Sequence, residues 1–253
     1  MSPSSIPSPT QRPPDLLGQT VVVLGGSAGI GLETARRARA EGARVVLTGR
    51  DPERLRRAAI EIGAASTAAF DATDPGAVER FFGELPGPID HVMVTAGRPP
   101  YGRVLAMDVA QVRRLLDDHL VMAIQVARHA AGKVRPGGAL LFMSGTGARR
   151  PAIGLALTAT LTAALPALVA NLALEIAPVR VNVIAAGFVD TPLSADLLGD
   201  QLESRRAQLR ETLPIRRVVG PADVAALAIH LMVNGALTGA TYDVDGGQQL
   251  VPA

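Results

Sequence analysis

A short β-branched run leads directly into three closely spaced glycines in this chain, and few folds accept that combination. Residues 20–31 read Thr-Val-Val-Val-Leu-Gly-Gly-Ser-Ala-Gly-Ile-Gly, and a helical pattern follows. Gly25 suits a tight bend, Gly29 lets a ligand approach the backbone without a Cβ in the way, and Gly31 permits close packing of a helix on a strand. The start of that helix presents N–H groups to an anion. The pattern predicts a turn that binds the phosphates of a dinucleotide, although glycine also serves plain helix and strand packing.

The length and composition of the chain favour one α/β domain. The chain has 253 residues, of which 48% are apolar, enough to bury a single core. It has no cysteine, so it can form neither a disulfide nor a thiolate metal site, and no metal is expected. A net charge of +2, two tyrosines, five phenylalanines and no tryptophan leave little to stack on bases, so no nucleic-acid partner is expected.

Two segments bear on where the protein resides. Residues 1–14 are rich in Ser and Pro and have neither the basic start nor the apolar core of a secretory signal. A disordered tail is expected there, followed by one domain over 15–253. The run 155–174 carries no charge and is long enough to span a membrane, but its three threonines, Asn171 and Pro166 argue against a span. We expect a buried helix or a subunit interface instead, no membrane association, and a cytoplasmic protein.

Hydrophobic periodicity predicts an alternation of strands and helices along the rest of the chain. The expected strands are 21–24, 44–48, 66–70, 91–95, 139–143, 179–184 and 240–244, and the expected helices are 30–40, 52–62, 76–84, 109–131, 155–176 and 222–232. A Pro-Gly-Gly sequence at 136–138 is expected to separate the long helix from the strand after it, and 187–219 is expected to form a mobile substrate lid. Strands joined by helical crossovers predict an α/β fold with a parallel sheet covered on both faces. Such a sheet binds its ligand where its strands end.

From the glycine turn onward the chain resembles the short-chain dehydrogenase/reductase family over nearly its whole length. The matching motifs, in chain order, are Gly25-x-x-x-Gly29-x-Gly31, Asp71, Thr95-Ala96-Gly97, Val181-Asn182-Val183, Gly187-Phe188-Val189-Asp190-Thr191 and Asp243-Val244-Asp245-Gly246-Gly247. The resemblance implies a single Rossmann-type doubly wound domain with a seven-stranded parallel sheet. It also implies a nicotinamide cofactor, a small-molecule substrate and a homodimer or homotetramer.

The resemblance assigns cofactor contacts position by position. It implies that the pyrophosphate is held by Gly25, Ser27, Gly29 and Ile30, the adenine by Asp71 and Ala72, the ribose by Ala96 and Gly97, and the nicotinamide carboxamide by Gly187, Val189 and Thr191. Each of these turns must also exist to close the sheet, so a purely structural role is the alternative.

The tip of the second expected strand favours NADP(H) over NAD(H). Gly49 stands where a carboxylate would accept hydrogen bonds from the ribose hydroxyls of NAD. Arg50 follows it and offers a planar guanidinium that suits the 2′-phosphate of NADP. The alternative is that Arg50 pairs with Asp51 or Glu53 on the next helix, and NAD(H) then stays possible.

The chain departs from the family at the positions that carry proton chemistry. By the family's spacing, the catalytic Tyr position falls on Thr158, the Lys position on Thr162, the Ser position on Gly145 beside Ser144, and the Asn position on His119. A phenol of pKa about 10 becomes a usable proton donor near neutral pH when a neighbouring ammonium stabilises its anion, and a threonine hydroxyl cannot replace it.

Other groups are candidates for the missing role. Thr158 and Thr162, one helical turn apart, are expected to position a substrate oxygen or a water. His119 is the best replacement acid by its chemistry, and Ser144 at the end of its strand is a further candidate. Tyr101, in the loop after the fourth expected strand, is another. Each of these side chains can equally be an ordinary core or loop residue.

Two functions stay open at this point. The first is an NADP(H)-dependent oxidoreductase that transfers hydride to or from a small carbonyl, imine or activated alkene through a non-standard active site. The second is a catalytically silent NADP(H)-binding protein that acts as a sensor, scaffold or oligomer partner. We favour the enzyme, because an ionisable residue at the Asn position indicates altered chemistry. Few aromatics and many alanines predict an apolar substrate, whereas Arg98, Arg149 and Arg150 either attract an acidic one or only solvate the rim.

Overall fold

The computed structural model describes residues 15–251, so the tail expected at 1–14 lies outside the described residues. The strands are β1 (Thr20–Leu24), β2 (Arg44–Gly49), β3 (Ser66–Ala69), β4 (Ile89–Val94), β5 (Val134–Gly145), β6 (Arg180–Ala186) and β7 (Thr241–Val244). They form one parallel seven-stranded sheet in the order β3-β2-β1-β4-β5-β6-β7. The predicted doubly wound α/β fold is confirmed.

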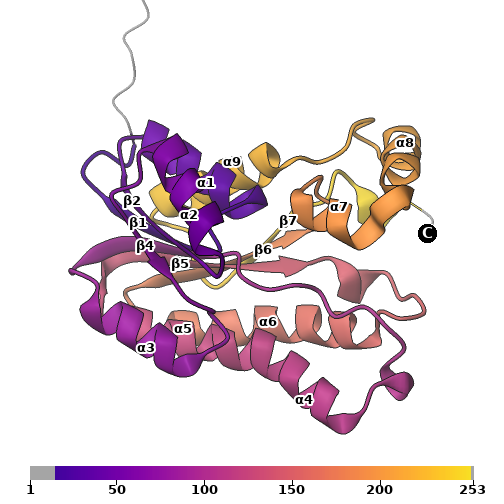
Figure 1. Ribbon diagram of the computed structural model, residues 1–253, viewed down its shortest axis with the longest axis horizontal. Helices are drawn as coiled ribbons and strands as arrows, with labels where there is room; N and C mark the ends of the chain where they lie inside the picture. Colours follow the sequence, from indigo (N-terminus) through magenta and orange to yellow (C-terminus); the bar gives the residue numbers. More distant parts are fainter. Residues whose placement is uncertain (1–14, 252–253) are drawn as a thin grey trace, which may run out of the picture.

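Helices cover both faces of this sheet (Figure 1). One face carries α1 (Gly29–Ala40), α2 (Pro52–Ile62) and α9 (Pro221–Val233), and the other carries α3 (Pro75–Glu84), α4 (Val109–Leu116), α5 (Met122–Ala131) and α6 (Ala156–Glu175). The segment after β6 contains α7 (Pro192–Leu198) and α8 (Leu202–Thr212), which lie at one end of the sheet. Short helical turns are η1 (Val104–Ala106), η2 (Asp117–Val121), η3 (Gly147–Arg149), η4 (Gly199–Gln201) and η5 (Gln248–Leu250).

Several helices begin where the sequence places an aspartate before the first turn. The carboxylate of Asp51 accepts a hydrogen bond from the backbone N–H of Arg54 at 3.0 Å, and a proline follows it at the first helical position. The carboxylates of Asp74 and Asp108 cap α3 and α4 in the same way. These caps satisfy N–H groups that have no partner within the helix, which is why the starts of these helices were predictable.

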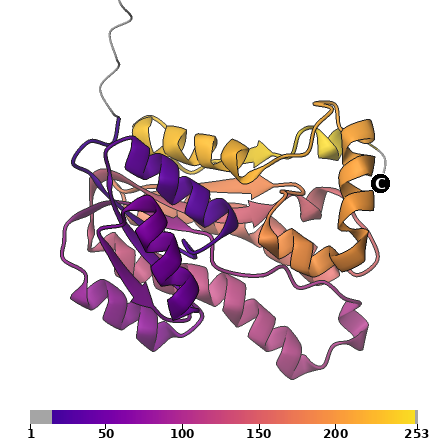
Figure 2. The same cartoon turned by 45° about the horizontal axis from the view of Figure 1, so that its top comes forward.

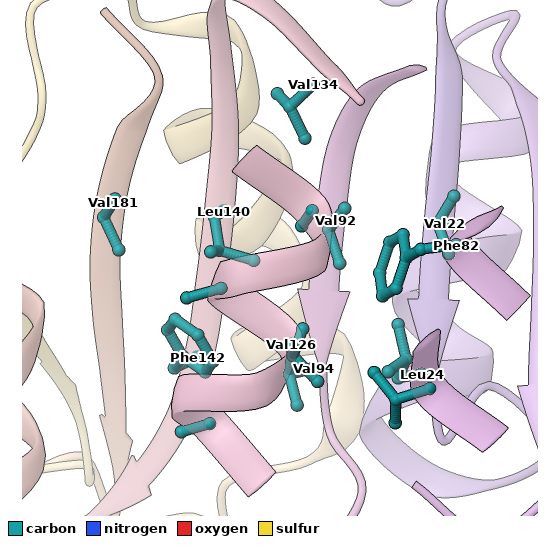
Figure 3. Close-up of a cluster of buried hydrophobic side chains, with 14 of the residues drawn as sticks. Val22, Leu24, Phe82, Val92, Val94, Val126, Val134, Leu140, Phe142 and Val181 are labelled. Atoms are coloured by element: carbon teal, nitrogen blue, oxygen red, sulfur yellow. The ribbon is translucent and has the colours of Figure 1, made fainter. Parts of the chain in front are cut away.

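Side chains alternate between the two faces along each strand, so the sheet divides the core into two layers. Val22 and Leu24 of β1 belong to the layer with Phe82 of α3 and Val126 of α5, as Figure 3 shows. Val21 and Val23 belong to the other layer, with residues of α1 and α9. Because both faces are covered, the middle residues of the central strands, such as 21–24 of β1 and 92–94 of β4, are apolar and buried on both faces.

Two expected boundaries were wrong. The helix expected over 109–131 is interrupted by η2, a π-helical turn that separates α4 from α5. A π turn differs from an α-helix by one inserted residue, and no local pattern signals it. The sequence 136–138 lies within β5 rather than before it, because the strand shifts its register against β4 there. A Cβ built on Gly138 would lie 2.2 Å from the carbonyl oxygen of Asp90, so glycine lets the strand pass.

The helix α6 is long and apolar enough to cross a membrane by length and composition, which for a single helix is weak evidence. It packs against β6 and buries Leu161, Leu165 and Val169 in the core. Only 28% of its most apolar window is buried, so the described chain covers one side of α6 and leaves the other open. The described chain buries one side of α6, and the subunit interface expected for this helix stays a prediction.

Candidate functional site

The turn between β1 and α1 has no room for a side chain at Gly25, Gly26 or Gly31. The backbone N–H groups of Gly25 and Gly26 donate to the carbonyl of Thr48 at 3.1 and 2.9 Å, which holds the turn to the end of β2. Gly25 has a φ of +86° and Gly29 one of +53°, in the region that favours glycine. A Cβ on Gly31 would lie 2.3 Å from the carbonyl oxygen of Gly25. The turn thus brings glycine backbone to the start of a helix.

Thr95, which directly follows the neighbouring strand β4, forms hydrogen bonds to this turn. Its hydroxyl lies 2.9 Å from the carbonyl oxygen of Leu24 and 3.1 Å from that of Gly25, and its backbone N–H also donates to Leu24. The sequence analysis used Thr95 only as part of a motif. The available signal was a hydroxyl residue directly after β4, the strand that parallel topology places beside β1. Ala96, the next residue, lies against the turn as well, since a Cβ on Gly25 would sit 2.8 Å from its N atom.

Ser27 and Arg50 both lie at the tip of β2. A Cβ on Gly49 would lie 3.1 Å from the Ser27 hydroxyl oxygen, so the serine packs on the strand end. The Arg50 side chain is 78% exposed, and its Nη1 atom is 3.9 Å from a carboxylate oxygen of Asp71. Asp51 and Glu53, the alternative partners, instead lie 3.6 and 3.2 Å from the arginines at 54 and 56. The guanidinium of Arg50 therefore points to the side of the site where Asp71 lies.

Asp71 and Ala72 shape the other side of this region. The Asp71 carboxylate accepts from the N–H and the hydroxyl of Thr73 at 3.0 and 2.9 Å, which fixes the turn after β3. Ala72 is buried and borders a surface cavity of about 300 Å³. The cavity extends to η2 and the start of α5, and its other lining residues are Thr73, Pro75, Asp117, Val121, Met122 and Gln125.

The loop after β6 closes the site from the opposite side. Thr191 caps α7 by accepting from the N–H of Ser194, and its Cγ2 atom would lie 3.4 Å from a Cβ built on Gly29. The N–H of Phe188 donates to the side-chain oxygen of Gln248 at 2.8 Å. The structure thus brings the turn between β1 and α1 close to the loop after β6, which is called the sixth-strand loop below. Gln248 is a positioning residue that was not predicted from the sequence. No local pattern marks it, because the contact joins residues 60 positions apart in the chain.

Thr158 and Thr162 lie beside the end of β5. The buried hydroxyl of Thr158 donates to the carbonyl of Pro100 at 2.7 Å, and that of Thr162 donates to the carbonyl of Ala159 at 3.1 Å. The Cγ2 atom of Thr162 would contact a Cβ on Gly145 at 3.5 Å. The expected Tyr, Lys and Ser positions are therefore neighbours in space. Both hydroxyl protons are engaged by backbone carbonyls, which leaves each oxygen to act as an acceptor.

Ser144 and His119 lie on two other elements, the end of β5 and the turn η2. Ser144 is half-buried, pairs with Ala185 of β6, and makes no hydrogen bond through its hydroxyl to any residue that the structure describes. His119 lies in η2, which packs against α6, and its Nδ1–H donates to the carbonyl of Leu115 at 2.8 Å. π-helical turns are frequent at functional sites. With Nδ1 engaged, the Nε2 atom of His119 remains for a ligand or a water.

Tyr101 is held between two tethers to the start of α6. One is the hydrogen bond from Thr158 to Pro100, and the other runs from the N–H of Gly102 to the carbonyl of Gly154 at 2.9 Å. The tyrosine is 55% exposed, and the burial of the rest of its ring raises the pKa of the phenol above 10.0. A raised pKa makes Tyr101 a weaker acid and so a poorer proton donor near neutral pH.

Comparison with known proteins finds similar proteins over nearly the whole described chain. The family model described as enoyl-(acyl carrier protein) reductase matches residues 25–249. The chain is 34% identical to galactitol 2-dehydrogenase (L-tagatose-forming) of Cereibacter sphaeroides, over 91% of this chain and 94% of that protein. It is 31% identical to the cyclic-di-GMP-binding biofilm dispersal mediator protein of Escherichia coli, over 90% of this chain and 96% of that protein. The structure of a short-chain dehydrogenase from Burkholderia cenocepacia in complex with NADP is similar to this one, with a TM-score of 0.83 and 28% sequence identity. The similarity covers 92% of this chain and 98% of that chain.

Proposed function

Because this chain belongs to the short-chain dehydrogenase/reductase family, we propose that it is an NADP(H)-dependent oxidoreductase with a non-standard active site. The substrate is a small, largely apolar carbonyl, imine or activated alkene. The observation that carries the proposal is the glycine turn, which Thr95 holds on one side and Thr191 approaches on the other. When bound, the cofactor supplies or accepts the hydride; the protein orients both partners and handles the proton.

The residues present fit a dinucleotide at this turn. Among the described residues, α1 has no side-chain cap and no acidic residue in its first turn, so the N–H groups there are left for an anion. We infer that Gly25, Ser27, Gly29 and Ile30 hold the pyrophosphate. The other proposed contacts are Asp71 and Ala72 to the adenine, Ala96 and Gly97 to the ribose, and Gly187, Val189 and Thr191 to the nicotinamide carboxamide.

Two features support NADP(H) as the cofactor. Gly49 leaves the tip of β2 without a carboxylate, and Arg50 beside it keeps an exposed guanidinium. A planar guanidinium binds a phosphate through two parallel hydrogen bonds, whereas a carboxylate there would repel it. The solved relative from Burkholderia cenocepacia holds NADP.

The proton chemistry rests on residues other than the usual phenol and ammonium, since α6 contains neither tyrosine nor lysine. We propose that Thr158 ties the loop after β4 to α6, that the Ser144 hydroxyl donates to a substrate oxygen or a water, and that the Thr162 oxygen accepts from a water or a substrate hydroxyl. His119 supplies the proton through Nε2, directly or through that water. Imines and activated alkenes suit such a site, because they need little proton donation when the hydride is transferred.

The test is turnover by purified protein with NADPH and a panel of ketones, imines and enones. We expect His119→Ala to lower kcat about tenfold or more and to change its pH profile, because general acid catalysis contributes about 10² to 10⁴ in rate. His129→Ala, a histidine on α5, is the control and keeps the wild-type kcat. NADPH binding by nicotinamide fluorescence separates loss of chemistry from loss of cofactor. Turnover that is identical in wild type and His119→Ala would contradict the role of His119.

The second candidate is a catalytically silent NADP(H)-binding protein that acts as a sensor, scaffold or oligomer partner. The engagement of the Thr158 hydroxyl by Pro100 favours it, since a side chain used in this way does no chemistry. The relative from Escherichia coli is also named for binding rather than for turnover. Tight NADPH binding without turnover of any panel member would decide for this function.

Three further properties complete the proposal. We propose a homodimer or homotetramer, because the open side of α6 and the apolar side of α4 lack a partner in the described chain. The protein is proposed to be cytoplasmic, in keeping with its lack of cysteine. The segment 187–219, with α7 and α8, is proposed as a mobile lid over the substrate.

A further inference from the structure

Two pairs of consecutive arginines lie at the same end of the molecule. Arg149 and Arg150 belong to the segment between β5 and α6, and Arg205 and Arg206 belong to α8; Figures 1 and 2 show both elements at the end where the sixth-strand loop lies. One arginine of each pair is neutralised. Arg149 forms an ion pair with Asp243. Arg206 lies 2.6 Å from a carboxylate oxygen of Asp190 and also pairs with Glu203.

The other arginine of each pair has no carboxylate beside it in the part of the chain that the structure describes. Arg150 donates to the carbonyl of Gln248 at 2.9 Å, and Arg205 donates to the side-chain oxygen of Gln208 at 2.6 Å. Both side chains are partly buried. Burial lowers the pKa of Arg205, and the positive charge of Arg150 lowers it further, so the two guanidinium groups act on each other. Two like charges near each other disfavour each other's charged form, and an anion bound between them would offset this repulsion.

The surroundings place Arg150 and the segment that follows α8 beside the loop after β6. Gln248, whose carbonyl binds Arg150, also holds the N–H of Phe188 through its side chain. The segment after α8 lies on the same C-terminal turn, since a Cβ on Gly247 would be 2.6 Å from Pro214 and one on Gly246 would be 2.7 Å from Ile215. The lid and the loop after β5 therefore meet beside the loop proposed to bind the nicotinamide.

We propose that Arg150 and Arg205 together bind an anionic group, a carboxylate or a phosphate, on the substrate. This rests on the proposed function and narrows its substrate to a molecule with a reactive apolar part and a charged end. Guanidinium groups suit both anions, because each offers parallel N–H donors to two oxygens. Arg149 and Arg206 are already neutralised, and they anchor the two segments that carry the proposed ligands.

The experiment compares two ketones that differ only in charge, 4-oxopentanoate and its methyl ester. Their affinities are measured by calorimetry on protein saturated with NADP⁺, which prevents turnover of a ketone and fills the phosphate sites of the cofactor turn. We expect the acid to bind about tenfold more tightly than the ester or better. Arg150→Gln and Arg205→Gln each remove this preference. Arg210→Gln, a change of the same charge on an exposed arginine of α8, keeps it.

A second titration with inorganic phosphate in the same samples tells which anion the pair selects. Binding of phosphate that the two variants lose assigns the site to a phosphorylated substrate, and binding of the acid alone assigns it to a carboxylate. Arg150→Lys keeps the charge and is expected to retain part of the preference for the acid over the ester. This variant distinguishes loss of the charge from misfolding as the cause of any loss in Arg150→Gln. Equal affinity for acid and ester, or a preference that survives in the Arg150→Gln, Arg205→Gln double variant, would overturn the proposal.

The outcome separates this inference from the proposed function. If wild-type protein fails to bind NADP⁺, the proposed function is lost, and the acid and ester titrations on the same protein without cofactor still test the arginine pair. If NADP⁺ binds but the acid and the ester bind with equal affinity, the cofactor proposal stands and the proposed anion site is wrong. Arg50→Gln reports any phosphate that binds in the cofactor turn instead, because it leaves Arg150 and Arg205 unchanged.

Discussion

Gly31 has less free space than the other glycines of the cofactor turn. A Cβ there would lie 2.3 Å from the carbonyl oxygen of Gly25 and 2.5 Å from the hydroxyl oxygen of Thr95. Gly31 is not among the glycines with positive φ, so the requirement is for space and not for an unusual backbone conformation. A larger residue has to displace either the turn or the end of β4, and both belong to the proposed phosphate site.

We expect Gly31→Ala to lower the free energy of unfolding by about 1 to 3 kcal/mol, the range for overpacking a tight site. NADPH affinity, measured by nicotinamide fluorescence, should fall about tenfold or more. Gly83→Ala is the matched control, because a Cβ at this helical position meets nothing within 4 Å. It should be neutral or stabilising by up to about 1 kcal/mol, since alanine is the better helix former. Wild-type NADPH affinity in Gly31→Ala would show that the turn does not hold the cofactor.

At this scale the sequence predicted what a local motif can predict. The spacing of Gly25, Gly29 and Gly31 identified the tight turn, because each glycine acts on its near neighbours. The partner of Thr158 was not predictable, since Pro100 lies on another loop and a threonine in a helix can turn its hydroxyl to either side. The sequence analysis expected that hydroxyl to face the substrate; its proton goes to the protein backbone.

The pairing of β4 with β5 depends on a buried histidine. His91 accepts a hydrogen bond at Nδ1 from the N–H of Ala139 at 3.1 Å, and its Nε2–H donates to the side-chain oxygen of Gln19 at 2.7 Å. Burial, assisted by the charge of Arg180, lowers the pKa of His91 to about 3. The folded protein therefore requires the neutral imidazole at the point where the two strands shift register.

His91 should make the protein less stable in mild acid. Its folded pKa of about 3 is below the unfolded value of 6.5, so the unfolded chain binds more protons below pH 6.5. The stability that the neutral ring contributes is present above pH 6.5 and is lost as the pH falls toward 3. Between pH 7 and pH 5 the loss is about 2 kcal/mol, at about 1.4 kcal/mol for each pH unit below 6.5.

Urea unfolding at pH 7 and pH 5 measures this loss. The His91→Gln variant keeps an acceptor for Ala139 and cannot be protonated, so it should lose about 2 kcal/mol less than wild type over this range. His230→Gln, at an exposed histidine of α9, is the control. The same loss in wild type and His91→Gln would show that His91 is not the group that titrates.

Helices and strands were predictable where the period of apolar residues or a helix cap specifies them. Their boundaries were less predictable where packing between two elements sets them. The apolar strands and the aspartate-capped starts of α2, α3 and α4 follow from adjacent residues. The π-helical turn η2 and the early start of β5 do not. Both depend on how a segment packs against its neighbours, as the close approach of Gly138 to Asp90 shows.

The single chain leaves one side of the molecule incompletely covered. α4 has no buried residue, although it carries apolar side chains such as Val109, which is 66% exposed. Along the open side of α6 lie Ala163 and Ala167, which are small and exposed. Small residues allow helix backbones to approach closely, so this surface suits packing against another copy of the chain.

A charge on this surface should break the proposed oligomer. We expect Ala163→Glu or Ala167→Glu to shift the protein toward a monomer and to weaken subunit association about tenfold or more, because a carboxylate would be buried without a partner. Sedimentation over a range of concentrations measures this. Ala226→Glu, at an exposed alanine of α9 on the opposite face, should leave the assembly unchanged. A wild type that is monomeric at every concentration would contradict the proposal.

The sequence by itself determined the order of strands and helices, the parallel sheet and the glycine turn, because each follows from the period of apolar residues or from space around adjacent backbone atoms. Only the tertiary structure decided which distant groups meet. It placed Gln248 against Phe188, directed the hydroxyl of Thr158 to the carbonyl of Pro100, and left Arg150 and Arg205 without a carboxylate partner among residues 15–251. These contacts join segments that are far apart in the chain, and their geometry exists only after the sheet has brought the strand ends to one edge.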